Sequence, residues 1–251
     1  MKSNFLKFAL FSFIAVSMLA CSKDDEVAPE EEEPVAAFAF DAQNPPLEVP
    51  TALQSSTNES ALAINSVLAQ ANIISSYGAY FDVPEGAEFS TTPISTTNSR
   101  VANVTGVRVY TWTYNDGQNS FTTAYQLSED DNDYIFEIFY NFGDGFFKLL
   151  EGRESKDAQR KGSLKWFDFS GGDTFLTYDW EEFENGDFEF NFITFSFKYE
   201  ILVNADGSGE INSFYEDALD AKYTWNAGGT AGTYTTYDDE GNITGTFDWS
   251  A

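Results

Sequence analysis

Alternating apolar and polar residues dominate the chain from Val101 to the C-terminus. Aromatic and β-branched runs are separated by turn-forming pairs such as Asn185-Gly186 and Asp206-Gly207. Such alternation places every second side chain on one face of a strand, and many connections are too short for crossover helices. The pattern predicts a mainly β fold. We expect an antiparallel meander of about ten strands, arranged as a barrel, half-barrel or sandwich.

One segment has helical periodicity instead. From Thr57 to about Ser76 the apolar residues recur three or four positions apart, and Thr57 or Asn58 can cap the first turn. The sequence predicts one N-terminal helix packed on the sheet, with this apolar stripe facing it: Ala61, Ile64, Val67, Leu68, Ala71 and Ile74. Residues 78–100 are rich in Gly, Pro, Ser and Thr and are expected to form a long connection.

The alternation changes phase once. Aromatic side chains occupy even positions from Phe188 to Phe192, and apolar ones occupy odd positions from Ile193 to Val203. Within one continuous strand this requires a bulge near Phe192 and Ile193, or a strand that bends from one sheet to another.

The hairpin around Asn185-Gly186 carries the densest group of candidate ligands. A three-residue loop with Gly186 in the left-handed region sets Trp180 opposite Phe190 and makes one coherent apolar face. The other face then gathers four carboxylates, and Glu181 lies about 5 Å from Glu189 at Cβ. The four are Asp179, Glu181, Asp187 and Glu189.

Three interpretations of these carboxylates remain open. They could form a hydrated outer face, a site for a hard divalent cation such as Ca²⁺, or the acid pair of a glycoside hydrolase. Abundant surface charge favours the hydrated face. Nothing in the sequence places the pair in a cleft, so the enzyme interpretation is the weakest and enzymatic activity is not expected.

Composition narrows the classes of function. The chain has 251 residues, a formal net charge of −28 and no His. A polyanion without a basic stripe does not bind nucleic acid through phosphates, and a chain without imidazole lacks Ser-His-Asp chemistry. Its 5 Trp, 13 Tyr and 25 Phe exceed what one core usually needs. Such rings serve as stacking platforms for glycans when Asp and Asn lie nearby.

The first 20 residues have the organisation of a secretory signal peptide. Lys2 and Lys7 accompany an apolar run that is too short to span a bilayer. The run ends Met18-Leu19-Ala20-Cys21, which resembles the lipobox of bacterial lipoproteins. The resemblance implies that the only cysteine of the chain, Cys21, is acylated and anchors the mature protein to a membrane.

The next five residues point to the location of the anchor. Ser22, Lys23, Asp24, Asp25 and Glu26 resemble the export signal of Bacteroidota-type surface lipoproteins. The resemblance implies an outer-membrane protein that faces the cell exterior. Residues 21–54 are rich in acid, Pro and Ala, which is typical of a linker, and residues 55–251 are expected to form a single helix-plus-β domain.

These features together predict a lipid-anchored cell-surface binding or structural module. Its expected partner, beside the membrane that holds the anchor, is a polysaccharide or a surface protein. One alternative is a carrier in which the curved sheet and the helix enclose an apolar ligand. The glycoside hydrolase acting through Glu181 and Glu189 is the third hypothesis.

Overall fold

A computed structural model describes residues 37–40, 46–94, 104–115, 117, 120–157, 160–169 and 172–250. Its strands form one antiparallel sheet in which neighbours in space are neighbours in sequence, from β1 to β13. The strands are β1 (Glu88–Ser90), β2 (Thr105–Asn115), β3 (Ser120–Glu129), β4 (Asp133–Asn141), β5 (Phe147–Ser155), β6 (Lys161–Phe167), β7 (Thr174–Glu182), β8 (Phe188–Thr194), β9 (Phe197–Val203), β10 (Gly209–Tyr215), β11 (Ala218–Trp225), β12 (Ala231–Tyr237) and β13 (Ile243–Ser250).

The mainly β class and the antiparallel meander are confirmed, but the predicted count of about ten strands is too low. The sheet has 13 strands, and they belong to one sheet rather than to two packed sheets. Strand β1 lies inside the segment expected to be a connection. Two hairpins, at residues 195–196 and 216–217, have no glycine in their turns. The predicted number of strands was too low because most turns were predicted from glycine.

The change of phase after Phe192 is one of these hairpins, so the expected bulge or bend is wrong. Strand β8 ends at Thr194 and β9 begins at Phe197. The Thr194 hydroxyl stabilises the turn, because its Oγ1 accepts from Phe197 N at 3.1 Å and lies 3.2 Å from Phe197 O, to which it donates. A side chain here supplies the hydrogen bonds that turn residues usually supply.

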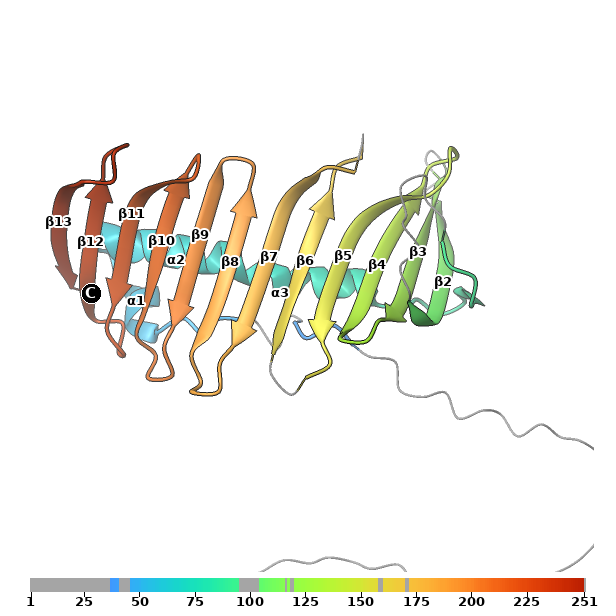
Figure 1. Cartoon of the computed structure of the whole chain (residues 1–251), viewed down its shortest axis with the longest axis horizontal. Coiled ribbons are helices and arrows are strands. Elements are labelled where there is room, and N and C mark those ends of the chain that lie inside the picture. Colours follow the sequence, from blue (N-terminus) through green and yellow to red (C-terminus); the bar gives the residue numbers. More distant parts are fainter. Residues whose placement is uncertain are drawn as a thin grey trace, which may run out of the picture. The chain divides into compact units, whose positions relative to one another are not determined.

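The helical segment packs on one face of the sheet as predicted. It comprises α2 (Glu59–Asn72), α3 (Ile74–Tyr77) and the 3-10 helix η1 (Gly78–Phe81), and α2 and α3 run across the strands (Figure 1). Asn58 caps α2, since its Oδ1 accepts from Ser60 N at 2.9 Å. All six residues of the predicted apolar stripe are buried. We call the sheet face against α2 the inner face and the opposite face the outer face.

Tryptophan and glycine residues pair across the strands of the inner face. Gly162 lies opposite Trp180, Gly209 opposite Trp225, and Gly232 opposite Trp249. A Cβ on any of these glycines would meet the indole ring of its partner. The three tryptophans are 3 to 5% exposed, so each glycine makes room for a ring that covers the backbone of the neighbouring strand.

The packed part of the chain includes residues assigned above to the linker. Phe38, Phe40 and Leu47 are buried, and a further helix, α1 (Thr51–Ser55), buries Leu53. Ala39 N donates to Glu154 Oε1 at 2.7 Å, which ties this segment to the inner face of β5. Phe38 and Phe40 both contact the Trp180 ring edge-on. The core therefore begins before the expected boundary at residue 55.

The outer face has a small apolar cluster above β2 to β4. Val109, Ala124 and Phe139 form a small buried cluster there, with Ile94 packed against it. Ile94 N donates to Gln126 Oε1 at 2.8 Å, and Gln126 Nε2 donates to Glu137 Oε2 at 2.6 Å. The segment after β1 thus covers the first strands on their outer face.

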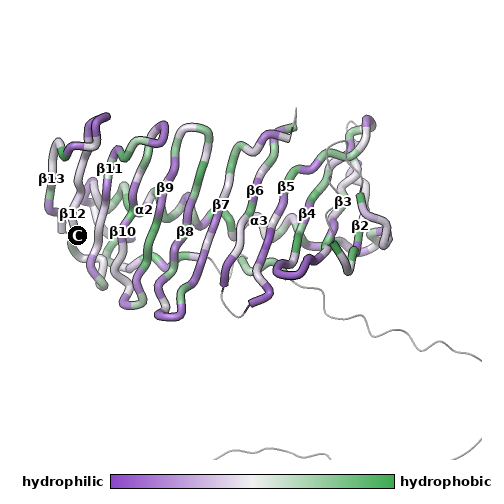
Figure 2. Tube along the Cα trace, viewed as in Figure 1, coloured by the Kyte–Doolittle hydropathy of each residue, from purple (hydrophilic) through white to green (hydrophobic). Residues whose placement is uncertain are grey.

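The hairpin turns lie along two edges of the sheet. We call upper turns those that follow even-numbered strands, at residues 116–119, 142–146, 168–173, 195–196, 216–217 and 238–242. The lower turns follow β3, β5, β7, β9 and β11, at residues 130–132, 156–160, 183–187, 204–208 and 226–230. In Figure 2 the β8–β9 turn at the upper edge is hydrophobic in colour, whereas the β7–β8 turn at the lower edge is mostly hydrophilic.

Candidate functional site

The predicted register of the acidic hairpin is confirmed. Trp180 pairs with Phe190, Tyr178 with Phe192, and Glu181 with Glu189. Gly186 has a φ of 85°, the left-handed conformation that the three-residue loop requires. Trp180 and Phe190 belong to the buried core, so the hairpin places its carboxylates on the outer face.

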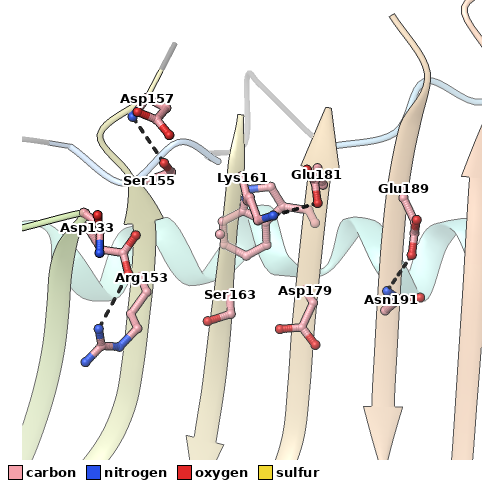
Figure 3. A pocket seen from close by; sticks show the side chains of 13 residues that line it. Asp133, Arg153, Ser155, Asp157, Lys161, Ser163, Asp179, Glu181, Glu189 and Asn191 are labelled. Atoms are coloured by element: carbon pink, nitrogen blue, oxygen red, sulfur yellow. Dashed lines mark hydrogen bonds and ion pairs between the residues drawn. The ribbon is translucent and has the colours of Figure 1, made fainter. Parts of the chain in front are cut away.

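Three of the four predicted carboxylates share a shallow hollow on that face. Asp179, Glu181 and Glu189 line it together with groups from β5 and β6, and its volume is about 530 Å³ (Figure 3). Asp187 does not join them. Its Oδ1 accepts from Ala205 N at 2.9 Å and its Oδ2 accepts from Asn185 Nδ2 at 2.7 Å, so this side chain stabilises two neighbouring lower turns.

Two carboxylates of the hollow already form an ion pair or a hydrogen bond with other side chains. Lys161 Nζ lies 2.9 Å from Glu181 Oε2, and Asn191 Nδ2 donates to Glu189 Oε1 at 3.1 Å (Figure 3). Burial raises the pKa of Asp179, and the nearby Lys165 offsets part of that rise. The repulsion expected between Glu181 and Glu189 is therefore reduced by a lysine and an amide of adjacent strands.

A calcium site requires several oxygens around one point. Within the part of the chain that the structure describes, no group of three or more His, Cys, Asp or Glu is arranged to hold a metal ion. The four-carboxylate calcium site stays a prediction that a binding experiment can test.

A second concavity lies on the inner face at the end of the sheet. It is a groove of about 740 Å³ between the first turn of α2 and strands β11 to β13. This volume is within the range of small-molecule sites. Sequence reasoning grouped Phe247 and Trp249 on one face but did not single out the groove, because the groove exists only where α2 begins.

One wall of the groove is a ladder of aromatic rings. Tyr223 pairs with Tyr234, which pairs with Phe247 on the edge strand. The ring centroids are 4.8 Å apart between the two tyrosines and 6.0 Å apart between Tyr234 and Phe247, with interplanar angles of 15° and 28°. Phe247 ends the ladder and is 56% exposed, so an aromatic surface is open to solvent at this edge.

The Tyr223 hydroxyl hydrogen-bonds to Tyr234 and stays protonated near neutral pH. Burial, and then the neighbouring Tyr234, raise the pKa of Tyr223 to about 12. Trp249 also lines the groove, and its buried indole N–H has no hydrogen-bond partner among the described residues. The aromatic wall thus includes polar groups as well as ring surface.

The opposite wall is the polar start of α2. Thr57, Asn58, Glu59 and Ser60 line it, and the exposed Glu59 adds a carboxylate. Asp248 of β13 also borders the groove, although strand alternation directs its side chain to the face opposite Phe247 and Trp249. No Lys or Arg is among the described residues that line the groove. The arrangement can place a ligand between ring surfaces and hydrogen-bond acceptors, and it disfavours a negatively charged ligand.

The predicted anchor and export signal lie outside the described residues. These are Cys21 and the five residues Ser22, Lys23, Asp24, Asp25 and Glu26. In the described part of the chain no helix is both long and apolar enough to cross a membrane. No known family model matches this sequence, and no curated protein matches it either.

Proposed function

We propose that this protein is a lipid-anchored binding module of the cell surface that takes an uncharged glycan in the inner-face groove. The observation that carries the proposal is the groove itself, where the Tyr223–Tyr234–Phe247 ladder faces the polar first turn of α2. A binding role also fits the open edge at β13, through which an extended ligand could leave the groove.

Sugar chemistry matches both walls. A pyranose ring has an apolar C–H surface that packs on aromatic rings, and hydroxyl groups that hydrogen-bond to carboxylates and amides. Glu59 supplies a carboxylate and Asn58 an amide beside the rings. The absence of Lys and Arg from the described lining favours neutral sugars over uronates and phosphorylated sugars.

A carrier of an apolar ligand fits the inner face less well. Helix α2 occupies the middle of that face, where Ile64, Leu68 and Phe190 are 0 to 1% exposed. A carrier needs that volume for its ligand. Native mass spectrometry of the purified protein distinguishes the two functions, since a carrier retains lipid and a glycan binder does not.

The membrane anchor of the proposal rests on the lipobox resemblance at Cys21. Each buried methylene of an acyl chain contributes about 0.8 kcal/mol, so two or three chains hold the protein firmly. Cys21→Ser should release the protein into the soluble fraction. Retention of a correctly cleaved Cys21→Ser variant in the membrane fraction would contradict the anchor.

Surface exposure has its own test. Replacing Lys23, Asp24 and Asp25 with Ala should leave lipidation intact and should protect the protein from protease added to whole cells. Unchanged digestion of the variant would count against an export signal at these positions.

The glycan proposal is tested on an array of neutral oligosaccharides, followed by calorimetry with the best ligand. Phe247→Ala and Tyr234→Ala should each weaken binding about fivefold or more, because stacking on an aromatic ring contributes roughly 1 kcal/mol or more. The matched control is Phe183→Ala, which removes a 39% exposed ring from a lower turn. Equal losses in all three variants, or no binding by any oligosaccharide, would overturn the proposal.

A further inference from the structure

Exposed aromatic rings gather on one edge of the sheet. Six lie in the upper turns or within two residues of them, with exposed fractions of 47 to 76%: Tyr114, Phe142, Phe169, Phe195, Phe197 and Tyr215. Among the described residues of the lower turns only Phe183 is comparable, at 39%. We call the six residues the aromatic edge. Large exposed apolar patches of this kind mark interaction sites.

Five of the six rings of the aromatic edge contact other aromatic rings. Tyr114 contacts Phe121, which contacts Phe142, with centroid distances of 5.3 and 5.5 Å. Phe147 continues the row between Phe142 and Phe169, at 5.8 and 5.5 Å. A second group pairs Phe197 with Tyr215 at 5.3 Å. The first group makes a continuous aromatic surface from β2 to the β6–β7 turn.

The charged residues of the upper turns all have the same sign. The sequence of the upper turns contains nine Asp and Glu residues and no Lys or Arg. The lower turns contain six acids, accompanied by Lys156 and Arg160. A negative aromatic surface repels phosphate headgroups and other polyanions, and it is complementary to a positively charged partner.

Contacts between cations and aromatic rings also occur within the protein itself. The Arg160 guanidinium lies 5.1 Å from the centre of the Phe40 ring and 5.5 Å from that of Phe188. Lys198 Nζ lies 5.1 Å from the Phe214 ring centre. A cation that stacks on an aromatic face is bound more strongly when carboxylates lie nearby. Aromatic and Arg side chains also contribute most of the binding free energy at many protein interfaces.

The start of the folded chain does not occupy the aromatic edge. Phe40 packs under Arg160 of a lower turn, and Pro50 and Leu53 lie against Gly229 of another lower turn. These described residues therefore lie near the lower turns.

We infer that the aromatic edge is the docking surface for a basic protein partner, which presents Arg and Lys side chains to these rings. The surface is separate from the glycan groove, so the inference goes beyond the proposed function. Binding should weaken as salt increases, because most of the described acids of the upper turns are exposed to solvent.

The test uses an oligoarginine peptide and an oligolysine peptide of equal length, with the full mature protein. The triple variant Phe142→Ser, Phe169→Ser and Phe195→Ser should bind oligoarginine about tenfold more weakly than wild type. The matched control changes three exposed apolar residues elsewhere, Leu62→Ser, Ile73→Ser and Phe183→Ser, and should bind within about twofold of wild type. Circular dichroism checks that both triple variants fold.

The outcomes are distinct. Preferential loss in the aromatic-edge variant, with oligoarginine bound more tightly than oligolysine, supports the inference. Equal affinity of the two triple variants would overturn it, since binding would then follow net charge alone. Binding of phosphatidylcholine vesicles that disappears in the aromatic-edge variant would overturn it in favour of a membrane, and binding of neutral oligosaccharides lost in that variant would overturn it in favour of a glycan.

Discussion

The middle of the inner face and its β11–β13 end have similar aromatic residues but different surroundings. In the middle, Tyr178 and Phe190 are 0 to 1% exposed beneath the helical segment and the N-terminal chain. At the end, Phe247 is 56% exposed and the Tyr223–Tyr234 pair borders a groove. The difference arises from coverage rather than from residue type, so the same alternating pattern produces core in one region and a candidate site in the other.

The helical segment is too short to cover the whole width of the sheet. Thirteen strands spaced at ~4.8 Å make a sheet ~58 Å wide. Helix α2 has 14 residues and is ~21 Å long at ~1.5 Å per residue. Even with α3 and η1 the helical segment is shorter than the sheet is wide. Helix α2 contacts β13 and η1 contacts β4, so it is the first turn of α2 that lies over the β11–β13 end.

The largest expected effect is on the free energy of unfolding, when a phenylalanine is replaced by alanine in each of the two regions. Phe190→Ala should destabilise the protein by about 3–5 kcal/mol, because it leaves a cavity in the covered core. Phe247→Ala should cost less than about 1 kcal/mol, since its ring is mostly in water already. Urea unfolding measures both free energies. Similar losses from the two variants would break the distinction between core and site.

The covered region also includes a titrating group. Burial raises the pKa of Glu154 to about 7, although the Ala39 N–H and Arg160 lower it in part. Because the folded state holds this proton more tightly than the unfolded state, Glu154 lowers stability progressively as pH rises from about 4.5 to about 7. Glu154→Gln should remove this slope and raise stability at pH 8 by up to about 3 kcal/mol.

Unfolding of wild type and Glu154→Gln at pH 5 and pH 8 checks this prediction. The two proteins should differ more at pH 8 than at pH 5. A difference that does not change with pH would show that the carboxyl of Glu154 does not titrate in this range in the folded protein.

A smaller effect is expected where α2 begins, at the boundary between the two regions. Asn58→Ala removes the N-cap and should cost about 1 kcal/mol, whereas Asn58→Ser keeps a capping oxygen and should cost less. Because Asn58 also lines the groove, Asn58→Ala should weaken glycan binding as well. Thermal melts give the first effect and calorimetry the second. Equal stability of the Ala and Ser variants would contradict the capping role.

The smallest effect is expected on the outer face. Glu181→Gln combined with Glu189→Gln removes like charges but also the exposed Lys161 ion pair, so stability should change by only a few tenths of a kcal/mol. A bound Ca²⁺ would instead stabilise wild type by about 2.7 kcal/mol at a hundredfold excess over Kd. Thermal melts of both proteins with Ca²⁺ and with chelator separate the cases, and a calcium-dependent shift confined to wild type would restore the metal hypothesis.

The sequence alone predicted the local features and missed those set by distant parts of the chain. The stripe from Ala61 to Ile74 and the Trp180–Phe190 register depend on spacing and on one left-handed glycine, and both are confirmed. The Phe195-Ser196 turn was missed because the Thr194 side chain replaces the usual turn residues. The groove was missed because exposure of Phe247 depends on where a helix nearly two hundred residues earlier begins.

Chemical-shift mapping with the best-bound neutral oligosaccharide tests the central claim most directly. The proposal predicts that amide signals of residues 57–60 and of strands β11 to β13 shift, while those beside Asp179 and Glu181 on the outer face do not. Shifts confined to the outer-face hollow, with the groove unchanged, would contradict the account.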